Sequence, residues 1–332
     1  MKLLMCSGKL ARWLIWVLLN FCALTTGSQA AQINFSSTTL AFSPAGPYTL
    51  PRDQAVGGSP LATAGVDITA SGISLLCQIT VTYTVTGTPF SSGIYTTGVN
   101  GIGMKFYVHN LDGSTTLITS AGVTRTVNVP ILGSTSVPGI NAELVVYGQV
   151  ATGSLSSSSP HVNVQVAGGL FCLTFNGTTQ VNTHFSNAAV TAITCTVTTP
   201  SVSVTLPNIS TTSLSSVGQT AGNTRFDIGL NCNSGTNVWV TLTDATIPSN
   251  TTEQLSLKPS STAGGVKLRI LKSNGNPVLF GPDSAVAGNT NQWLVGSSAS
   301  VNDIPLTVQY YRTGALTAGT VNAAATFTMS YQ

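Results

Sequence analysis

Short runs of alternating apolar and polar residues recur along this chain, and they constrain its fold more than any other feature of the sequence. Clear examples are Ile79–Val85, Val162–Val166, Val202–Leu206, Phe226–Leu230, Val238–Leu242 and Leu268–Ile270. Clusters of Gly, Pro, Asn and Ser separate the runs, and no long stretch places apolar residues three and four apart, as an amphipathic helix requires. The pattern therefore predicts an all-β protein in which each strand turns one face inward.

The first thirty residues have the features of an export signal. Basic residues up to Arg12 precede an apolar run from Trp13 to Leu24, and small residues follow at Ser28 and Ala30. We predict a signal peptide over 1–30 that is cleaved after Ala30. The apolar run is shorter than the roughly 20 residues that span a bilayer as a helix. We therefore expect a mature protein without a membrane anchor that is exported through the periplasm.

Charged side chains are unusually rare. They make up 6% of the chain, against about 25% in an average protein. Three of the twelve basic residues lie in the predicted signal, which leaves nine basic and nine acidic residues. With a net charge near zero, nothing favours electrostatic capture of nucleic acid.

Four cysteines remain after the predicted signal: Cys77, Cys172, Cys195 and Cys232. An even number of cysteines in an exported chain indicates two disulfides, although four cysteines permit three pairings. We favour Cys77 with Cys172 and Cys195 with Cys232, one bond in each half. The sequence has no CxxC or HxxxH spacing, so we expect no metal site.

The length of the mature chain suggests two domains. We place the boundary between about Asn187 and Cys195, which gives a first domain over 31–190 and a second domain over 191–332. The first should be an elongated, jelly-roll-like β-sandwich. The serine-rich stretch 154–159 is an alternative linker, but strand patterns flank it, and we interpret it as a surface loop.

The last strand-like segment carries the most information about the second domain. Apolar and small residues alternate strictly with polar ones after Gly319, at Val321, Ala323, Ala325, Phe327, Met329 and Tyr331, and the sequence stops at Gln332. We expect an incomplete immunoglobulin-like domain that lacks its last strand. Its open edge would need a strand from another chain, because exposed edges otherwise aggregate. The alternative is an ordinary final strand in a complete sandwich.

These residues resemble the C-terminal motif of chaperone–usher fimbrial subunits, and the cysteine pair Cys195 and Cys232 is placed as in that family. Further stretches resemble the pilin domains of two-domain tip adhesins, most closely type 3 fimbrial adhesins and N-acetylglucosamine-binding fimbrial lectins. They are 238–246, 265–270, 280–284 and 291–293.

The resemblance implies assembly by strand exchange. A periplasmic fimbrial chaperone would lend a strand to the groove, with its basic residues holding the carboxylate at Gln332. The next fimbrial subunit would replace that strand at the outer-membrane usher. No nucleotide cofactor is expected, and the sequence has no GxxxxGK[ST] loop. A whole domain precedes Cys195, so the subunit should receive a strand without donating one. That polarity places it at the fimbrial tip on the bacterial cell surface.

The receptor site is the least determined part of the sequence. Sugar sites combine an aromatic platform with directional polar groups. Tyr95 lies in a Gly-, Ser- and Thr-rich segment and is our candidate for an exposed aromatic ring. His109, Asn110 and Asp112 lie on a predicted turn, and Arg125 could bind a carboxylate. The alternatives are a plain hairpin turn, which the Asp-Gly pair favours, and for Arg125 a solvent-exposed edge residue.

The receptor itself is left open between a host glycan and a matrix protein such as collagen. The predicted mature start, Ala31–Phe35, lacks the aromatic terminus and nearby cysteine of mannose-specific lectins, so mannose specificity is not carried over. A minor or adaptor fimbrial subunit without receptor binding is one alternative.

Two further alternatives come from other classes of protein. A secreted hydrolase is disfavoured because the mature chain has three histidines and neither a GxSxG nor a HExxH motif, so we predict a protein that is not an enzyme. A eukaryotic cell-surface protein would account for the glycosylation motifs at Asn34, Asn176, Asn208 and Asn250. Such motifs also arise by chance in a chain this rich in Ser, Thr and Asn.

Overall fold

The computed structural model describes residues 32–71, 77–130, 133–156, 159–169, 176–299 and 301–332. Within these ranges the chain is built from strands, and the only helix is one 3-10 turn, η2 (Thr211–Leu214). The prediction of an all-β protein is thus confirmed. The described residues include no helix that is long and apolar enough to cross a membrane. The predicted signal peptide lies outside the described residues and stays a prediction.

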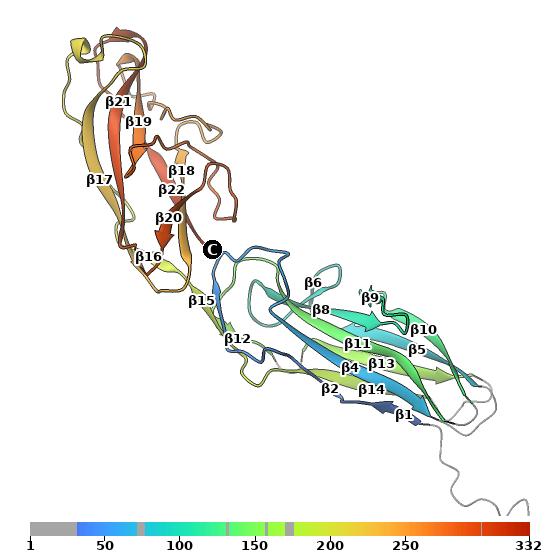
Figure 1. Ribbon diagram of the computed structural model, residues 1–332. Coiled ribbons are helices and arrows are strands. Elements are labelled where there is room, and N and C mark those ends of the chain that lie inside the picture. Colours follow the sequence, from blue (N-terminus) through green and yellow to red (C-terminus); the bar gives the residue numbers. More distant parts are fainter. Residues whose placement is uncertain (1–31, 72–76, 131–132, 157–158, 170–175, 300) are drawn as a thin grey trace, which may run out of the picture.

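The first half of the chain folds into two facing sheets (Figure 1). One has the order β1-β4-β11-β8-β7-β6, with β9 also paired to β8, and the other has the order β10-β5-β13-β14-β2. The strands of the first sheet are β1 (Gln32–Phe35), β4 (Ala62–Ser71), β6 (Pro89–Ser91), β7 (Ile94–Thr96), β8 (Ile102–His109), β9 (Thr115–Leu117) and β11 (Ser134–Val146). Those of the second are β2 (Thr39–Ala41), β5 (Cys77–Thr86), β10 (Val123–Val129), β13 (His161–Gly168) and β14 (Gly177–His184).

The alternation in the sequence builds the core between these sheets. In β5, Ile79, Val81 and Tyr83 are fully buried on one face, and in β8, Phe106 and Val108 are as well. The Tyr83 hydroxyl, which burial would leave unsatisfied, donates to the Pro138 carbonyl oxygen. The first half therefore has a closed apolar core of its own.

A small third sheet belongs to the first half and lies where the chain passes into the second. It has the order β12-β15-β3, in which β15 (Ala189–Ile193) runs parallel to β3 (Tyr48–Pro51) and antiparallel to β12 (Gly153–Ser154). The chain passes from β15 through Thr194 into the second half. The two halves lie end to end, and the C-terminus lies at their junction (Figure 1).

The second half has two sheets and a separate core. One sheet, of order β16-β17-β21-β19, contains β16 (Cys195–Val197), β17 (Thr220–Cys232), β21 (Asp303–Thr317) and β19 (Gly264–Lys272). The other, of order β20-β18-β22, contains β20 (Trp293–Ser297), β18 (Asn237–Asp244) and β22 (Ala325–Tyr331). This is an immunoglobulin-like arrangement of two packed sheets, and β22 forms one edge.

A buried carboxylate fixes the loop that follows β18. Asp244 is fully buried and accepts hydrogen bonds from the backbone N–H groups of Thr246, Ile247 and Ser256 and from the side chain of Asn250. Burial alone would raise the pKa of Asp244, but the hydrogen bonds outweigh it and lower the pKa below its ordinary value. Asp244 therefore stays ionised at neutral pH.

Candidate functional site

The outer edge of β22 carries backbone groups without strand partners. β22 is terminal in its sheet and pairs only with β18. Asn237 and Gln332 exchange both backbone hydrogen bonds, at 2.9 and 3.1 Å. In an antiparallel ladder this alternation turns the N–H and C=O groups of Ala325 and Phe327 away from β18. No strand in the described part of the chain pairs with that edge. It can therefore accept one.

Residues 200–209 face this edge from the other side and are also unpaired. The alternation of Val202, Val204 and Leu206 predicts a strand here, yet the structure assigns none. Among the described residues, no backbone hydrogen bond joins 200–209 to another backbone group. The segment is held instead by side chains: Val204 and Leu206 pack on the core, and the Tyr310 hydroxyl donates to the Pro207 carbonyl at 3.2 Å. A strand needs a ladder partner, and this segment has none.

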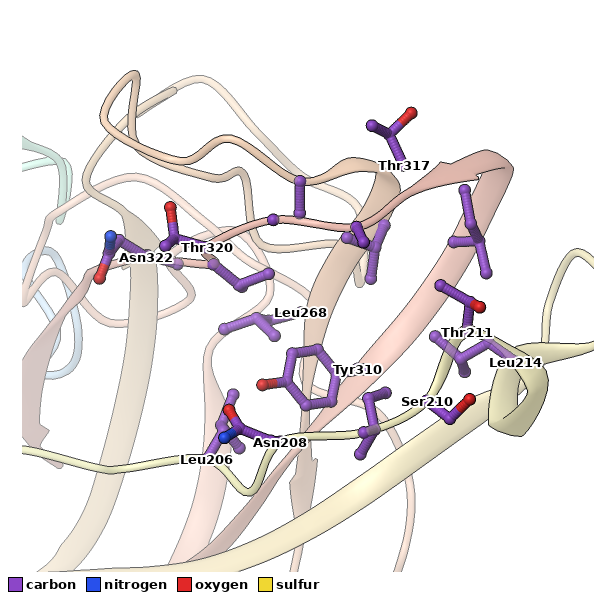
Figure 2. Close-up of a pocket in the computed structure, with 18 of the residues that line it drawn as sticks. Leu206, Asn208, Ser210, Thr211, Leu214, Leu268, Tyr310, Thr317, Thr320 and Asn322 are labelled. Carbon is purple, nitrogen blue, oxygen red and sulfur yellow. The ribbon is translucent and has the colours of Figure 1, made fainter.

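The space between the two segments is a groove with an apolar floor. Two adjoining hollows of about 700 and 430 Å³ share Val204, Leu206, Leu268 and Ala323 as lining residues. Figure 2 shows Leu268 and Tyr310 between the segment with Leu206 and Asn208 and the segment with Thr320 and Asn322. The floor is formed by core residues that include Phe226, Ile228, Leu242, Ile270 and Val308. We call this space the open groove.

The alternating motif at the C-terminal end divides between the open groove and the domain junction. The first five motif residues, Gly319, Val321, Ala323, Ala325 and Phe327, line the groove. Met329, Tyr331 and Gln332 lie beyond it. A side chain at Gly319 would collide with the backbone of 262–263, because an added Cβ would lie 2.5 Å from the Ala263 nitrogen. Gly319 therefore allows the chain to pass close to that segment.

The groove edge of β22 is closed at Tyr331 by the first domain. The Tyr331 N–H donates to the Asp53 carboxylate at 2.8 Å, and the Asp53 N–H donates to the Tyr331 carbonyl at 2.9 Å. Arg52 pairs with Asp53 at 2.8 Å, donates to the Met329 carbonyl at 3.1 Å and lies 4.7 Å from the centre of the Tyr331 ring. Asp53 is only 5% exposed and accepts a further bond from Gln149 at 2.8 Å. The two domains are therefore joined through the last residues of β22.

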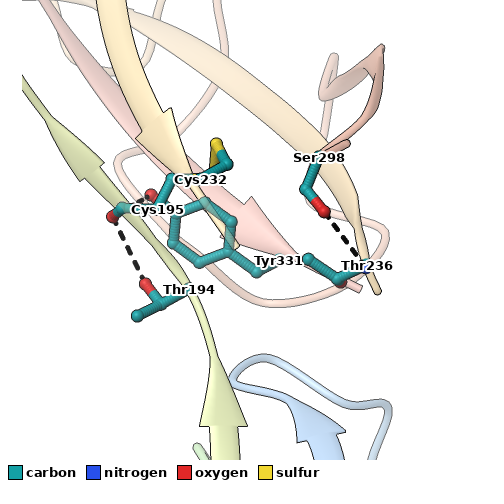
Figure 3. Close-up of a disulfide and its surroundings, with 6 residues drawn as sticks. All are labelled: Thr194, Cys195, Cys232, Thr236, Ser298 and Tyr331. Carbon is teal, nitrogen blue, oxygen red and sulfur yellow. Dashed lines mark hydrogen bonds between the residues drawn. A yellow bond between two sulfur atoms is a disulfide. The ribbon is translucent and has the colours of Figure 1, made fainter. Parts of the chain in front are cut away.

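Tyr331 also contacts the disulfide of the second domain. Cys195 and Cys232 are bonded across the β16–β17 pair, so this predicted pairing is confirmed. The Tyr331 ring lies beside this bond, and its hydroxyl donates to the Cys195 carbonyl at 3.0 Å (Figure 3). Burial raises the pKa of Tyr331, which keeps the phenol protonated as a donor. Cys172 lies outside the described residues, so the pairing with Cys77 stays a prediction.

Three of the residues predicted for receptor binding come together on the first domain. Asn110, Asp112 and Arg125 line one hollow of about 660 Å³, together with Asn128 and Pro138. β9 and β10 lie near one another at this side of the domain (Figure 1). We call it the Arg125 hollow. The hairpin turn and the cation were separate features in the sequence, and the structure brings them into one site.

Hydrogen bonds hold the polar groups of the Arg125 hollow in place. Arg125 donates from Nε to Asn110 Oδ1 at 2.8 Å, from Nη2 to Thr116 Oγ1 at 2.6 Å and from Nη1 to the Thr124 carbonyl at 2.9 Å. Asp112 accepts from the Ser114 hydroxyl and N–H at 2.6 and 2.9 Å. These bonds, with a minor contribution from Arg125, lower the pKa of Asp112.

Two predicted receptor residues lie elsewhere. Tyr95 is only 3% exposed and packs edge-on against Phe106 in the core. The prediction that its segment exposes it is wrong, because Tyr95 lies on the inward face of β7 opposite Met104. His109 is exposed at the end of β8 but is not part of the hollow, and its ring lies 3.5 Å from the Asn141 amide.

Arg52 and Asp53 were not predicted as functional residues from the sequence. They are an adjacent pair of opposite charges in a turn, and nothing local indicates that they reach β22. The rarity of charged residues in this chain was the signal that could have identified the pair. A charged side chain is seldom buried without a specific partner.

Known proteins with similar sequences and structures are fimbrial proteins. A family model for fimbrial proteins matches residues 183–332. The F17c-G fimbrial adhesin of Escherichia coli is 44% identical over 166 residues, which cover 47% of this chain and 48% of that protein. The chain thus spans about half the length of the first curated relatives that it matches.

Two more relatives extend the comparison. The major fimbrial subunit SMF-1 of Stenotrophomonas maltophilia is 31% identical over 150 residues, which cover 44% of this chain and 89% of that subunit. Among solved structures, the CupB6 tip adhesin of Pseudomonas aeruginosa aligns over 90% of this chain and 94% of its own, with a TM-score of 0.40 and 18% identity.

The fold is a β-protein with two separate apolar cores, and an open groove runs along the β22 edge of the second. The chain belongs to the fimbrial protein family.

Proposed function

We propose that this protein is a fimbrial tip adhesin whose second domain receives a strand from another polypeptide and whose first domain attaches to a host receptor. The open groove carries the assembly part of the proposal. Its two rims, 200–209 and β22, both lack ladder partners on the sides that face each other, and the floor between them is apolar. An added strand would supply backbone hydrogen bonds to both rims and cover the floor with alternate side chains.

Burial of apolar side chains favours occupation of the open groove by a partner strand. The motif residues from Gly319 to Phe327 correspond to a strand of about 30 Å. Burying about five apolar side chains of a partner strand would contribute on the order of 10 kcal/mol before entropy is subtracted. A periplasmic chaperone would lend such a strand, and a neighbouring fimbrial subunit would replace it at the usher.

The experiment is to supply the strand in cis. The mature chain would be extended after Gln332 by a flexible linker and a strand with five alternating apolar residues. The matched control carries the same extension with those residues changed to Ser. Trp239 and Trp293 lie in the second domain and the first domain has no Trp, so tryptophan fluorescence reports on the second domain alone.

We expect the apolar extension to raise the thermal midpoint of the second domain by about 15 °C or more and the serine extension to leave it unchanged. Amide exchange at Ala325, Phe327 and 200–209 should slow only with the apolar extension. Slow exchange at these amides in the unextended, monomeric chain would disprove the need for a donated strand. Co-expression with a periplasmic fimbrial chaperone should yield a soluble one-to-one complex, whereas the chain alone should aggregate.

The first domain supports the attachment part of the proposal, because it has a closed core of its own and precedes the domain with the open groove. Binding of the full mature chain to a panel of glycans and matrix proteins tests it. A chain that assembles into fibres but binds nothing on the panel would favour the adaptor-subunit alternative.

A further inference from the structure

The cations of the first domain differ in how they are neutralised. The segment 31–190 has only Arg52, Lys105 and Arg125. Arg52 pairs with Asp53, and Lys105 lies half-buried on the outer face of β8. Arg125 makes no ion pair with any residue that the structure describes. Of the two guanidinium groups of this domain, that of Arg52 is in an ion pair, and that of Arg125 is in none among the described residues.

The position of Arg125 makes this unusual. It lies on the core-facing side of β10, in line with the buried Val123, Val127 and Val129, and is itself half-buried. A charge withdrawn from water on a core-facing position normally has a partner of opposite charge, because desolvation is costly. Here its three contacts, to Asn110, Thr116 and Thr124, are all neutral oxygens.

Those contacts leave donors free in a fixed geometry. A guanidinium has five N–H groups, and its three bonds within the described part of the chain leave one N–H on Nη1 and one on Nη2. Asn110 is itself fixed, because its amide donates to Ser114 Oγ and Thr116 Oγ1, both at 3.0 Å. The guanidinium is therefore oriented before any ligand arrives, which lowers the entropic cost of binding. A carboxylate can accept from both free N–H groups.

The rest of the hollow fits a sugar ring. Asn128 and Thr135 offer amide and hydroxyl groups, and Leu111, which is 60% exposed, and Pro138 offer small apolar surfaces. A volume of about 660 Å³ accommodates one or two rings. Sugars present hydroxyl groups and apolar C–H surfaces together, whereas a flat apolar patch, typical of a protein interface, is missing from the lining residues.

We propose that the Arg125 hollow binds a carboxylated sugar, a sialic or uronic acid at the end of a glycan, with the sugar carboxylate on Arg125. This inference rests on the proposed attachment role of the first domain and names its ligand class. Asp112 at the rim is engaged by Ser114 and so leaves the guanidinium to the ligand.

The test is calorimetric or interferometric binding of the full mature chain to defined probes. The probes are α2,3-sialyllactose, its methyl ester, lactose and a disaccharide that ends in glucuronic acid. The free acid differs from the ester only in the carboxylate charge. We expect at least tenfold tighter binding of the acid, since hydrogen bonds between charged groups contribute about 1.5–3 kcal/mol. This preference should weaken in high salt.

The variants locate the site. Arg125→Gln should weaken acid binding roughly tenfold or more, and Arg125→Lys should weaken it less, because it keeps the charge but loses the planar fork. Lys105→Gln removes the other unpaired cation and should change nothing. Leu111→Trp places a large ring in the hollow from a lining residue that is 60% exposed and is not among the hydrogen-bond partners of Arg125, so it should abolish binding at an unchanged thermal midpoint even if Arg125→Gln unfolds the domain.

Equal binding of the acid and the ester, or full binding by Leu111→Trp, would overturn the inference. So would Arg125-dependent binding of a Glu-rich peptide without any binding of sugars, because the ligand would then be a protein carboxylate. Attachment to neutral glycans or collagen that ignores Arg125 would overturn this inference and leave the proposed attachment role standing. No attachment to any probe would remove both.

Discussion

The two domains use the same alternating strands but bury them differently. In the first domain, core residues such as Leu144, Val164 and Phe106 are fully buried between two sheets. In the second, Val321, Ala323 and Phe327 pack on the core yet stay partly exposed along the open groove. The same period-two pattern thus gives a closed core where both sheets are complete and an open one where an edge lacks its neighbour. This difference is the basis of the proposal that the second domain takes a strand from a partner.

The largest effect on stability should come from replacing a phenylalanine in the core of the first domain, and we compare it with the same replacement in the open groove. Phe106→Ala, in the closed core, should cost about 3–5 kcal/mol. Phe327→Ala, in the groove, should cost less than half of that in the chain alone, because water already reaches the site, and more once a strand is supplied in cis. Denaturant unfolding measures both, with tryptophan fluorescence for the second domain and amide hydrogen exchange in β8 for the first. Equal costs in the chain alone would contradict the comparison.

Removal of the Cys195–Cys232 disulfide should affect only the open domain. The pair of substitutions Cys195→Ser and Cys232→Ser should lower the stability of the second domain by about 2–5 kcal/mol, since the bond closes a loop within it. The first domain should unfold at the same denaturant concentration as before. Treatment of the parent chain with a reductant is the control for the effect of the serines. A matching shift in the first domain would show that the two cores unfold as one unit.

Asp53→Ala tests whether the junction supports the open edge. It leaves the Tyr331 N–H without its acceptor and should destabilise the second domain by about 1–3 kcal/mol. Amide exchange at Tyr331 should speed up more than at Met104, which lies in the closed core. Asp67→Ala is the matched control, because Asp67 is exposed on the first domain, and we expect it to change stability by less than about 0.5 kcal/mol. Similar effects of the two substitutions would mean that the junction contributes little.

The smallest expected effect is a pH dependence of stability that is confined to the second domain. The pKa of Asp244 in the folded state lies below its ordinary value of 3.8, so its contribution is present above about pH 4. It should be lost as the pH falls through the lowered pKa. Acid titration of tryptophan fluorescence should show this loss in the parent and not in Asp244→Asn. An identical acid transition in both proteins would assign the loss to other carboxylates.

Much of this protein could be predicted from the alternation of its residues. A strict period of two identifies inward-facing residues, so the all-β fold and the apolar face of the last strand followed directly. The cysteine pair at 195 and 232 was predictable because spacing and family resemblance agreed. Tyr95 was mispredicted because glycine and serine neighbours suggest a loop, whereas pairing with β8 turns its ring into the core.

Alternation in the sequence was enough to predict most strands and their inward faces, because these depend on neighbours two positions apart. It failed at Val202–Leu206, where the pattern is present and the backbone has no strand beside it to pair with. Only the tertiary structure decided that Arg125 meets Asn110 and that Asp53 meets Tyr331 across most of the chain. Those contacts join strands and turns that are distant in sequence, and local periodicity carries no information about which distant residue lies opposite. The physical reason is that a side chain's face is set locally, while its partner is set by how the sheets pack.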